Sequence, residues 1–206
     1  MNLTDALRTH RLLAIVRGPD PDAALAAVLT LAESGVALIE VSLTGADALG
    51  TIRRARAALG PEFHLGAGTV LTVDDARAAA DAGATFLVTP AIADSLDEAP
   101  RLGLPVLAGA LTPSEVVRAR AAGAAAVKLF PASFGGPDYL AALRDPFPDT
   151  PLVPVGGVDA EGARRYLERG AIAVGVGSPL LGDAVRGGDA AALRQRAAAF
   201  LAAVRA

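Results

Sequence analysis

The chain has 206 residues, of which 52% are hydrophobic and 20% are charged, and its formal net charge is −3. This composition is typical of a globular protein rather than a disordered one, and the acidic balance argues against a nucleic-acid-binding surface. The absence of cysteine excludes disulfides and thiolate metal sites, and two isolated histidines without a ligand motif argue against a zinc enzyme.

Short apolar segments alternate along the chain with longer, alanine-rich segments that carry scattered charges. Each apolar segment is rich in valine, isoleucine and leucine and contains or adjoins glycine or proline, which is typical of a buried parallel strand. The eight strands expected from this pattern span residues 12–18, 37–43, 64–70, 85–90, 105–111, 125–131, 151–157 and 171–178.

The segments between these strands carry helix start and stop signals. Four of these segments begin with Asp-Pro, with a capping pattern such as Thr-x-x-Asp or Thr-Pro-x-Glu, or with Asp, and these four end in glycine. They span residues 20–35, 72–83, 112–123 and 159–170. Helices therefore alternate with strands.

This alternation predicts a single (β/α)8 TIM barrel over residues 1–206, with a short helix before the first strand. An open, doubly wound sheet is the alternative, since it shares the alternation. The count of eight strands favours the barrel, as does the lack of a glycine-rich dinucleotide-binding turn after the first strand. In such a barrel the active site lies at the carboxyl ends of the strands.

Lys128 is the only lysine among the 19 lysine and arginine residues, and it interrupts an apolar strand. Alternation along the strands directs both Lys128 and Glu40 into the barrel. A buried ion pair, or a lysine that reaches solvent, would explain this without chemistry. Arginine would serve an ion pair as well, however, whereas only a buried lysine can lose its proton and attack a carbonyl. We therefore predict Schiff-base chemistry at Lys128.

Glycines end the last two expected strands, with Gly156 and Gly157 in one and Gly177, followed by Ser178, in the other. Backbone N–H groups of such loops can approach an anion, and the loops after strands 7 and 8 commonly bind phosphate in this fold. Tight turns without a ligand are the alternative. Together with Lys128 and Glu40, the loops suggest a class I aldolase that acts on a phosphorylated substrate.

These motifs resemble one known family, the 2-keto-3-deoxy-6-phosphogluconate (KDPG) and 4-hydroxy-2-oxoglutarate (KHG) aldolases. The resemblance runs nearly end to end, through AIVRG, GVALIEVSLT, GAGTVLT, FLVTP, LTPSEV, VKLFPAS, PVGGV and AVGVGS. It implies a (β/α)8 fold, a homotrimer, no metal or other cofactor, and cleavage of a phosphorylated keto acid to pyruvate and an aldehyde. We expect a soluble, cytoplasmic protein without nucleic-acid or membrane partners.

The resemblance also implies roles for individual residues. Lys128 matches the Schiff-base lysine, and Glu40 matches the general acid and base, which needs a pKa raised by burial. The expected substrate contacts are Phe130 beside the imine, Thr69 with Gly68 at the pyruvate carboxylate, Pro90 in the same pocket, and Gly156, Gly157, Gly177 and Ser178 at the phosphate.

Two positions depart from the family pattern. Thr44 stands where many members have an arginine that contacts the substrate carboxylate, and we expect Arg17, at a neighbouring strand end, to supply that charge. Val155 stands where phosphogluconate-specific members typically have threonine. Relatives that act on the C4 epimer, 2-keto-3-deoxy-6-phosphogalactonate (KDPGal), resemble the chain better at this position.

The sequence thus predicts cleavage of KDPG to pyruvate and glyceraldehyde 3-phosphate, with 4-hydroxy-2-oxoglutarate as a further substrate. KDPGal aldolase is the alternative. A barrel that has lost activity and serves as a structural or regulatory subunit is another, but the retention of Lys128 and Glu40 argues against it. A metal-dependent aldolase is disfavoured by the lack of clustered histidine and carboxylate ligands.

Overall fold

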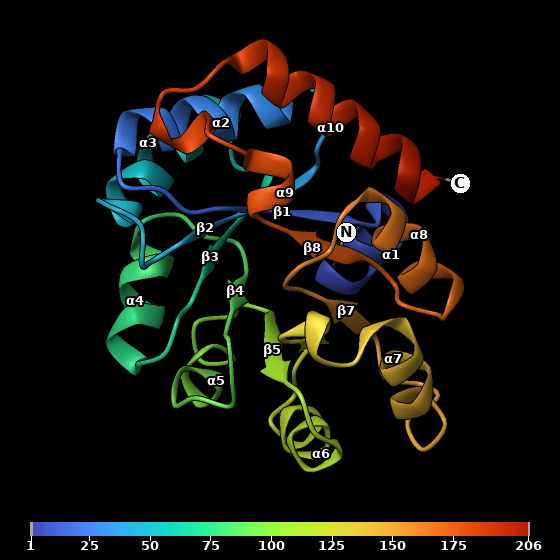
Figure 1. Ribbon diagram of the computed structural model, residues 1–206. Coiled ribbons are helices and arrows are strands. Elements are labelled where there is room, and N and C mark those ends of the chain that lie inside the picture. Colours follow the sequence, from blue (N-terminus) through green and yellow to red (C-terminus); the bar gives the residue numbers. More distant parts are fainter. Residues whose placement is uncertain (1, 206) are drawn as a thin grey trace.

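A computed structural model describes residues 2–205. Its eight strands are parallel and alternate with helices (Figure 1). They are β1 (Leu12–Val16), β2 (Leu38–Ser42), β3 (His64–Gly68), β4 (Leu87–Val88), β5 (Val106–Ala110), β6 (Ala126–Leu129), β7 (Leu152–Pro154) and β8 (Val174–Val176).

The strands are hydrogen-bonded in the order β7-β6-β5-β4-β3-β2-β1-β8. An isolated parallel bridge between Val155 and Gly175 joins the two ends of this series, so the sheet closes on itself. The (β/α)8 barrel predicted from the sequence is therefore confirmed, and the open doubly wound sheet is not found.

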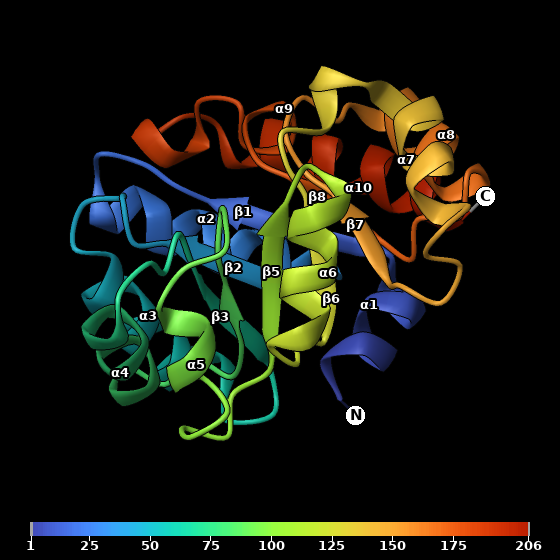
Figure 2. The same cartoon turned by 90° about the horizontal axis from the view of Figure 1, so that it is seen from below.

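The helices lie outside the barrel, except for α1, which lies across one end of it (Figures 1 and 2). They are α1 (Leu3–His10), α2 (Pro21–Glu33), α3 (Ala48–Leu59), α4 (Val73–Asp81), α5 (Ser95–Glu98), α6 (Pro113–Ala121), α7 (Gly136–Arg144), α8 (Ala160–Glu168), α9 (Ser178–Leu181) and α10 (Ala190–Arg205). Two 3₁₀ helices, η1 (Ala132–Phe134) and η2 (Ala184–Arg186), lie in the loops after β6 and β8.

The helix boundaries follow the capping signals in the sequence. Asp20 accepts hydrogen bonds from the first turn of α2, and Asp159 does the same for α8. Thr72 and Thr112 each complete a capping box with the acid three residues later, at the starts of α4 and α6. These contacts satisfy N–H groups that a helix start leaves unpaired, which fixes where each helix begins.

Two groups of buried apolar side chains stabilise the barrel. One group lies between the strands and the surrounding helices and includes Ile39, Val41 and Val127. The other fills the barrel interior, where Leu7 of α1 packs with Phe86 and other inward side chains. The alternation expected for β2 and β6 is therefore observed, because Ile39, Val41, Val127 and Leu129 face the helix layer.

The fourth strand is shorter than the predicted span of residues 85–90. The backbone N–H of Gly109 in β5 donates to the hydroxyl Oγ1 of Thr89 at 3.0 Å rather than to a backbone carbonyl. That hydroxyl in turn donates to the carbonyl of Ala91 at 2.7 Å. A side chain thus takes the place of the strand ladder, and regular pairing of β4 stops at Val88.

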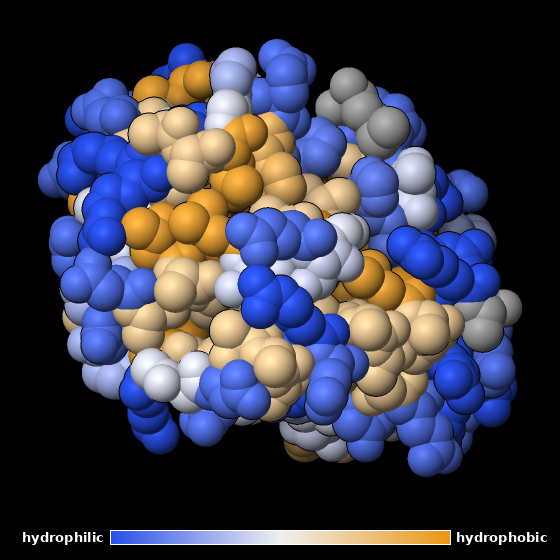
Figure 3. All heavy atoms as spheres, turned by 90° about the horizontal axis from the view of Figure 1, so that it is seen from above, coloured by the Kyte–Doolittle hydropathy of each residue, from blue (hydrophilic) through white to orange (hydrophobic). Residues whose placement is uncertain are grey.

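The outer surface on the side of α2 and α10 is a mosaic of apolar patches bordered by hydrophilic residues (Figure 3). Over residues 2–205, no helix combines the length and the apolar character needed to cross a membrane.

Candidate active site

Glu40 and Lys128 enter the barrel interior from opposite walls. Glu40 belongs to β2 and Lys128 to β6, and these strands lie four positions apart in the closed ring of eight. Both side chains are almost fully buried, with exposed fractions of 1% and 5%. Inward side chains of diametrically opposed strands face one another, so the fold brings together two groups that are far apart in the sequence.

The carboxyl of Glu40 lies in a confined, poorly hydrated position. A methyl group added to Gly68 would lie 2.5 Å from its Oε1, so only glycine leaves room for it there. Its Oε2 is buried and has no hydrogen-bond partner. Burial raises the pKa of Glu40 above its ordinary value of 4.5, although the positive charges of Lys128 and Arg17 oppose the rise.

The geometry does not favour a plain structural ion pair at this position. Among the side chains of residues 2–205, the ion pairs formed are all on the outside of the barrel, and none joins Lys128 to Glu40. The positive charge of Lys128 opposes the rise in the pKa of Glu40, although the two side chains form no ion pair. An amine and a carboxyl that are not paired with each other remain available for acid–base chemistry on a bound imine.

Phe130 forms one wall beside the amine. The Nζ atom of Lys128 lies 5.2 Å from the centroid of its ring, which is 38% exposed at the barrel mouth. Gly156 has a φ of +101°, and a methyl group on it would lie 3.3 Å from the same ring. Phe130 and the loop after β7 therefore meet directly over Lys128.

A chain of three hydroxyl groups lies near the ends of β2 and β3. Ser42 Oγ lies 2.9 Å from Thr44 Oγ1 and 2.9 Å from Thr69 Oγ1. Thr69 has a φ of +60°, a left-handed conformation that is costly for a threonine and often marks a functional loop. Ser42 is absent from the predicted site residues, although it shares the inward alternation of Glu40 and Thr44.

Pro90 lies at the end of β4, where the neighbouring strand fixes its backbone. A methyl group on Gly109 would clash with the Pro90 carbonyl group, so β5 approaches this turn closely only because residue 109 is glycine. Thr89 is fully buried and holds both sides of the turn through its hydroxyl. The sequence gives no sign of this bond, because Thr89 falls there within the strand predicted over residues 85–90.

The glycine loops adopt the conformations that glycine permits. Gly156 and Gly157 both have positive φ, and the N–H of Ser133 donates to the Gly156 carbonyl at 3.1 Å. On the other side of β8, Gly177 and Ser178 line a pocket of about 260 Å³.

Arg17 lines the same pocket, which places it beside the loop after β8. Its charge is nevertheless close enough to Glu40 to affect the pKa of that carboxyl. Arg17 is thus near the glycine loop, and its charge also acts on the carboxyl.

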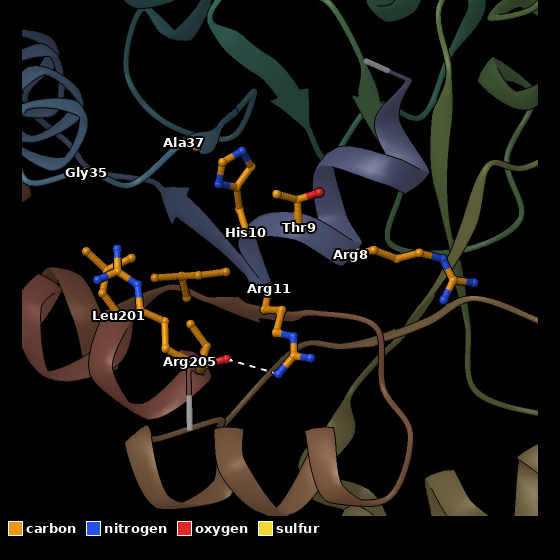
Figure 4. A pocket seen from close by; sticks show the side chains of 10 residues that line it. Arg8, Thr9, His10, Arg11, Gly35, Ala37, Leu201 and Arg205 are labelled. Atoms are coloured by element: carbon orange, nitrogen blue, oxygen red, sulfur yellow. Dashed lines mark hydrogen bonds between the residues drawn. The ribbon is translucent and has the colours of Figure 1, made fainter.

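A separate hollow opens at the opposite end of the barrel, where the strands begin (Figure 4). It is lined by Arg8, Thr9, His10 and Arg11 from the end of α1 and by Arg205 of α10. The side chain of Arg8 points away from those of Arg11 and Arg205, and Arg11 donates to the carbonyl of Val204. Since the guanidinium groups diverge, this hollow does not form a convergent site.

Comparisons with known proteins agree with this geometry. The family model described as KDPG and KHG aldolase matches residues 3–195. A probable 2-dehydro-3-deoxy-6-phosphogalactonate aldolase from Rhizobium meliloti is 37% identical over 194 residues, which is 93% of the chain and 90% of the relative. A 2-dehydro-3-deoxy-phosphogluconate aldolase from Pseudomonas aeruginosa is 40% identical over 139 residues, which is 66% of the chain and 63% of the relative. A solved structure described as native KDPGal has a TM-score of 0.88 at 35% identity and covers 94% of each chain.

Proposed function

The chain belongs to the KDPG and KHG aldolase family, and from this premise we propose that it cleaves KDPGal to pyruvate and glyceraldehyde 3-phosphate through a Schiff base on Lys128. The family makes the protein an aldolase and hence a carbon–carbon lyase. The observation that carries the proposed mechanism is the buried pair of Lys128 and Glu40, which face each other across the barrel without forming an ion pair.

The reaction begins when the Lys128 amine attacks the C2 keto group of the substrate. Glu40 supplies and removes protons as the carbinolamine forms and loses water to give the imine. The C3–C4 bond then breaks, its electron pair passes into the imine, and Glu40 takes the proton of the C4 hydroxyl. Glyceraldehyde 3-phosphate leaves. Protonation of the remaining enamine and hydrolysis of the imine release pyruvate and restore the amine.

The other site residues receive roles that agree with their positions. Phe130 walls the imine, Thr69 and Gly68 hold the pyruvate carboxylate, and Pro90 lines that pocket. We propose that Arg17 supplies the positive charge that is missing at Thr44. Gly156, Gly157, Gly177 and Ser178 hold the phosphate through their loops.

Trapping of the imine tests the mechanism. The protein is incubated with pyruvate and borohydride, and its peptides are then weighed. We expect a stable adduct on the peptide that contains Lys128, and no adduct in Lys128→Arg, which keeps the positive charge. An unmodified Lys128 peptide in an active preparation would overturn the Schiff-base mechanism.

We place KDPGal before KDPG as the proposed substrate. This reverses the order predicted from the sequence, which put KDPG first. The galactonate-type relative matches nearly the whole chain, whereas the gluconate-type relative matches a shorter part of it. Val155 also favours KDPGal. It is 4% exposed, and it offers no hydroxyl at the position where phosphogluconate-specific members have threonine. KDPG remains the second candidate, supported by its relative's 40% identity over the matched part.

Comparison of kcat/KM on the two epimers tests this choice. We expect the wild-type protein to favour KDPGal, and Val155→Thr to shift the ratio towards KDPG by about fivefold, since one added hydrogen bond contributes about 1 kcal/mol. If the wild-type protein instead prefers KDPG, the proposal that KDPGal is its substrate is wrong.

We also propose a homotrimer, as the family resemblance implies. The side chain of Phe134 is 73% exposed near the barrel mouth and packs edge-on against Tyr139, with 6.4 Å between ring centroids. Large exposed aromatic side chains of this kind are common at interfaces between subunits. Sedimentation equilibrium should report a particle of three chains, and a monomer at micromolar concentration would contradict the proposal.

A further inference from the structure

We infer that Arg186, which belongs to none of the family motifs, contacts the phosphate of the substrate and makes the protein selective for phosphorylated keto acids. This inference rests on the proposed function. Arg186 and Arg17 line one pocket together with Gly177 and Ser178, although 169 positions of sequence separate the two arginines. Two arginines therefore line a pocket beside the glycine loop after β8.

The backbone that carries Arg186 is firmly held. Ala184 and Val185 of η2 are buried, and a methyl group on Gly18 would lie 2.5 Å from the Cβ of Val185. The segment thus packs directly on the end of β1, next to Arg17. Only glycine at position 18 allows this approach.

A second contact fixes the start of the same segment. Arg196 of α10 donates to the carbonyl of Leu180 at 2.7 Å and to that of Leu181 at 2.8 Å. These bonds anchor the turn that connects α9 to η2. Arg186 is consequently exposed on a fixed backbone, so only its side chain, and not the segment that carries it, has to be ordered when it binds a ligand.

The charges of the pocket suit a phosphate monoester. No aspartate or glutamate lines it, and no ion pair within residues 2–205 involves either Arg17 or Arg186. A phosphate monoester carries close to two negative charges at neutral pH, and arginine binds phosphate oxygens with well-matched geometry. Arg186 therefore supplies a positive charge for the phosphate, in addition to the backbone N–H groups of the loop after β8.

Kinetics on matched substrates test the inference. Arg186→Gln and Arg186→Lys are compared with the wild type on KDPGal and on the unphosphorylated 2-keto-3-deoxygalactonate. A charge-assisted hydrogen bond contributes about 1.5–3 kcal/mol, so kcat/KM for KDPGal should fall roughly 10- to 100-fold in Arg186→Gln. The value for the unphosphorylated substrate should change less than about twofold, and Arg186→Lys should recover part of the loss.

Arg120→Ala is the control, because Arg120 is an exposed arginine on α6 outside the pocket, and it should behave as the wild type on both substrates. Equal losses on both substrates in Arg186→Gln, or no loss on KDPGal, would overturn the inference.

Calorimetric titration with inorganic phosphate tests the role of Arg186 independently of the proposed function. Phosphate should bind more weakly to Arg186→Gln than to the wild type, whether or not the protein cleaves KDPGal, and equal binding would count against Arg186. Failure of the wild type to form the pyruvate adduct, by contrast, would reject the proposed mechanism and leave the phosphate test standing.

Discussion

Glu40 is the residue at which stability and chemistry conflict. A carboxyl in the barrel interior, with one oxygen lacking any hydrogen bond, is expensive to ionise. The protein keeps it close to Gly68, which leaves just enough space, and opposite Lys128, whose charge offsets part of the cost. The result is a carboxyl that can hold a proton above the pH at which an exposed glutamate has lost it, as a general acid must.

Glu40→Gln should therefore stabilise the fold while it abolishes cleavage. The pKa of Glu40 is raised by burial, so the folded state binds the proton more tightly than the unfolded state. The associated stability is fully present below pH 4.5, the ordinary value, and is lost as the pH rises through the higher folded-state pKa. Melting temperatures measured from pH 4 to 8 should show an advantage of Glu40→Gln that grows with pH, at about 2–4 °C per kcal/mol.

An advantage that shrinks as the pH rises would contradict this prediction. Glu161→Gln is a suitable control, because Glu161 is exposed in the first turn of α8, and its effect on the melting temperature should be small at every pH.

The helices of the barrel begin where short-range contacts fix them. At the start of α6, Glu115 Oε2 accepts hydrogen bonds from the N–H groups of Leu111 and Thr112, at 3.0 and 2.8 Å, and from the Thr112 hydroxyl. These bonds hold the loop after β5 as well as the helix. All the partners lie within five residues, which is why the capping pattern in the sequence predicted this boundary correctly.

Glu115→Ala should lower the free energy of unfolding by about 1 kcal/mol at pH 7, the usual contribution of such a hydrogen bond. The hydrogen bonds from the Thr112 and Leu111 backbone hold the pKa of Glu115 below its ordinary 4.5. Its contribution is therefore present above pH 4.5 and is lost as the pH falls through the lower folded-state pKa. Urea denaturation of the variant and the wild type at pH 7 and at pH 3.5 would measure this.

The opposite pH trend, with a larger cost in acid, would contradict the capping role of Glu115. Glu161→Ala provides the matched comparison, since this acid also lies in a first helical turn but makes no side-chain hydrogen bond in the described part of the chain.

For the whole molecule, the α1 helix closes one end of the barrel. Leu7 is fully buried among the inward side chains, and the hydroxyl of Thr4 donates to the carbonyl of Ala125, just before β6. The candidate active site occupies the other end. The apolar helix α1 fills the base of the barrel. In the described strands, polar groups therefore gather around Lys128 only at the mouth.

Leu7→Ala should destabilise the whole barrel by about 2–5 kcal/mol, the usual cost of a truncated core leucine. Guanidinium denaturation should show a lower midpoint in a single cooperative transition, because α1 packs on side chains of many strands. Val117→Ala is the control, since Val117 is 52% exposed on α6 and should cost less than about 0.5 kcal/mol. An unchanged midpoint for Leu7→Ala would show that α1 is dispensable to the fold.

The sequence alone determined the alternation of strands and helices and the helix caps, and it identified Lys128 as the candidate for imine chemistry. Each of these depends on residues a few positions apart, because strand alternation has a period of two and a capping box spans four residues. The residue types also limit the chemistry, since lysine can form an imine and arginine cannot. The shortened β4 was missed because the Gly109 N–H of β5 donates to the Thr89 hydroxyl rather than to a backbone carbonyl.

The tertiary structure decided which distant residues meet. Closure of the barrel through Val155 and Gly175 places β2 opposite β6, and this alone brings Glu40 and Lys128 face to face. The pairing of β8 with β1 brings the segments that follow these strands together, so that Arg186 and Arg17 line one pocket. No local pattern specifies such a pair, because the contact arises only when the first and last strands join and the chain between them has folded around the core.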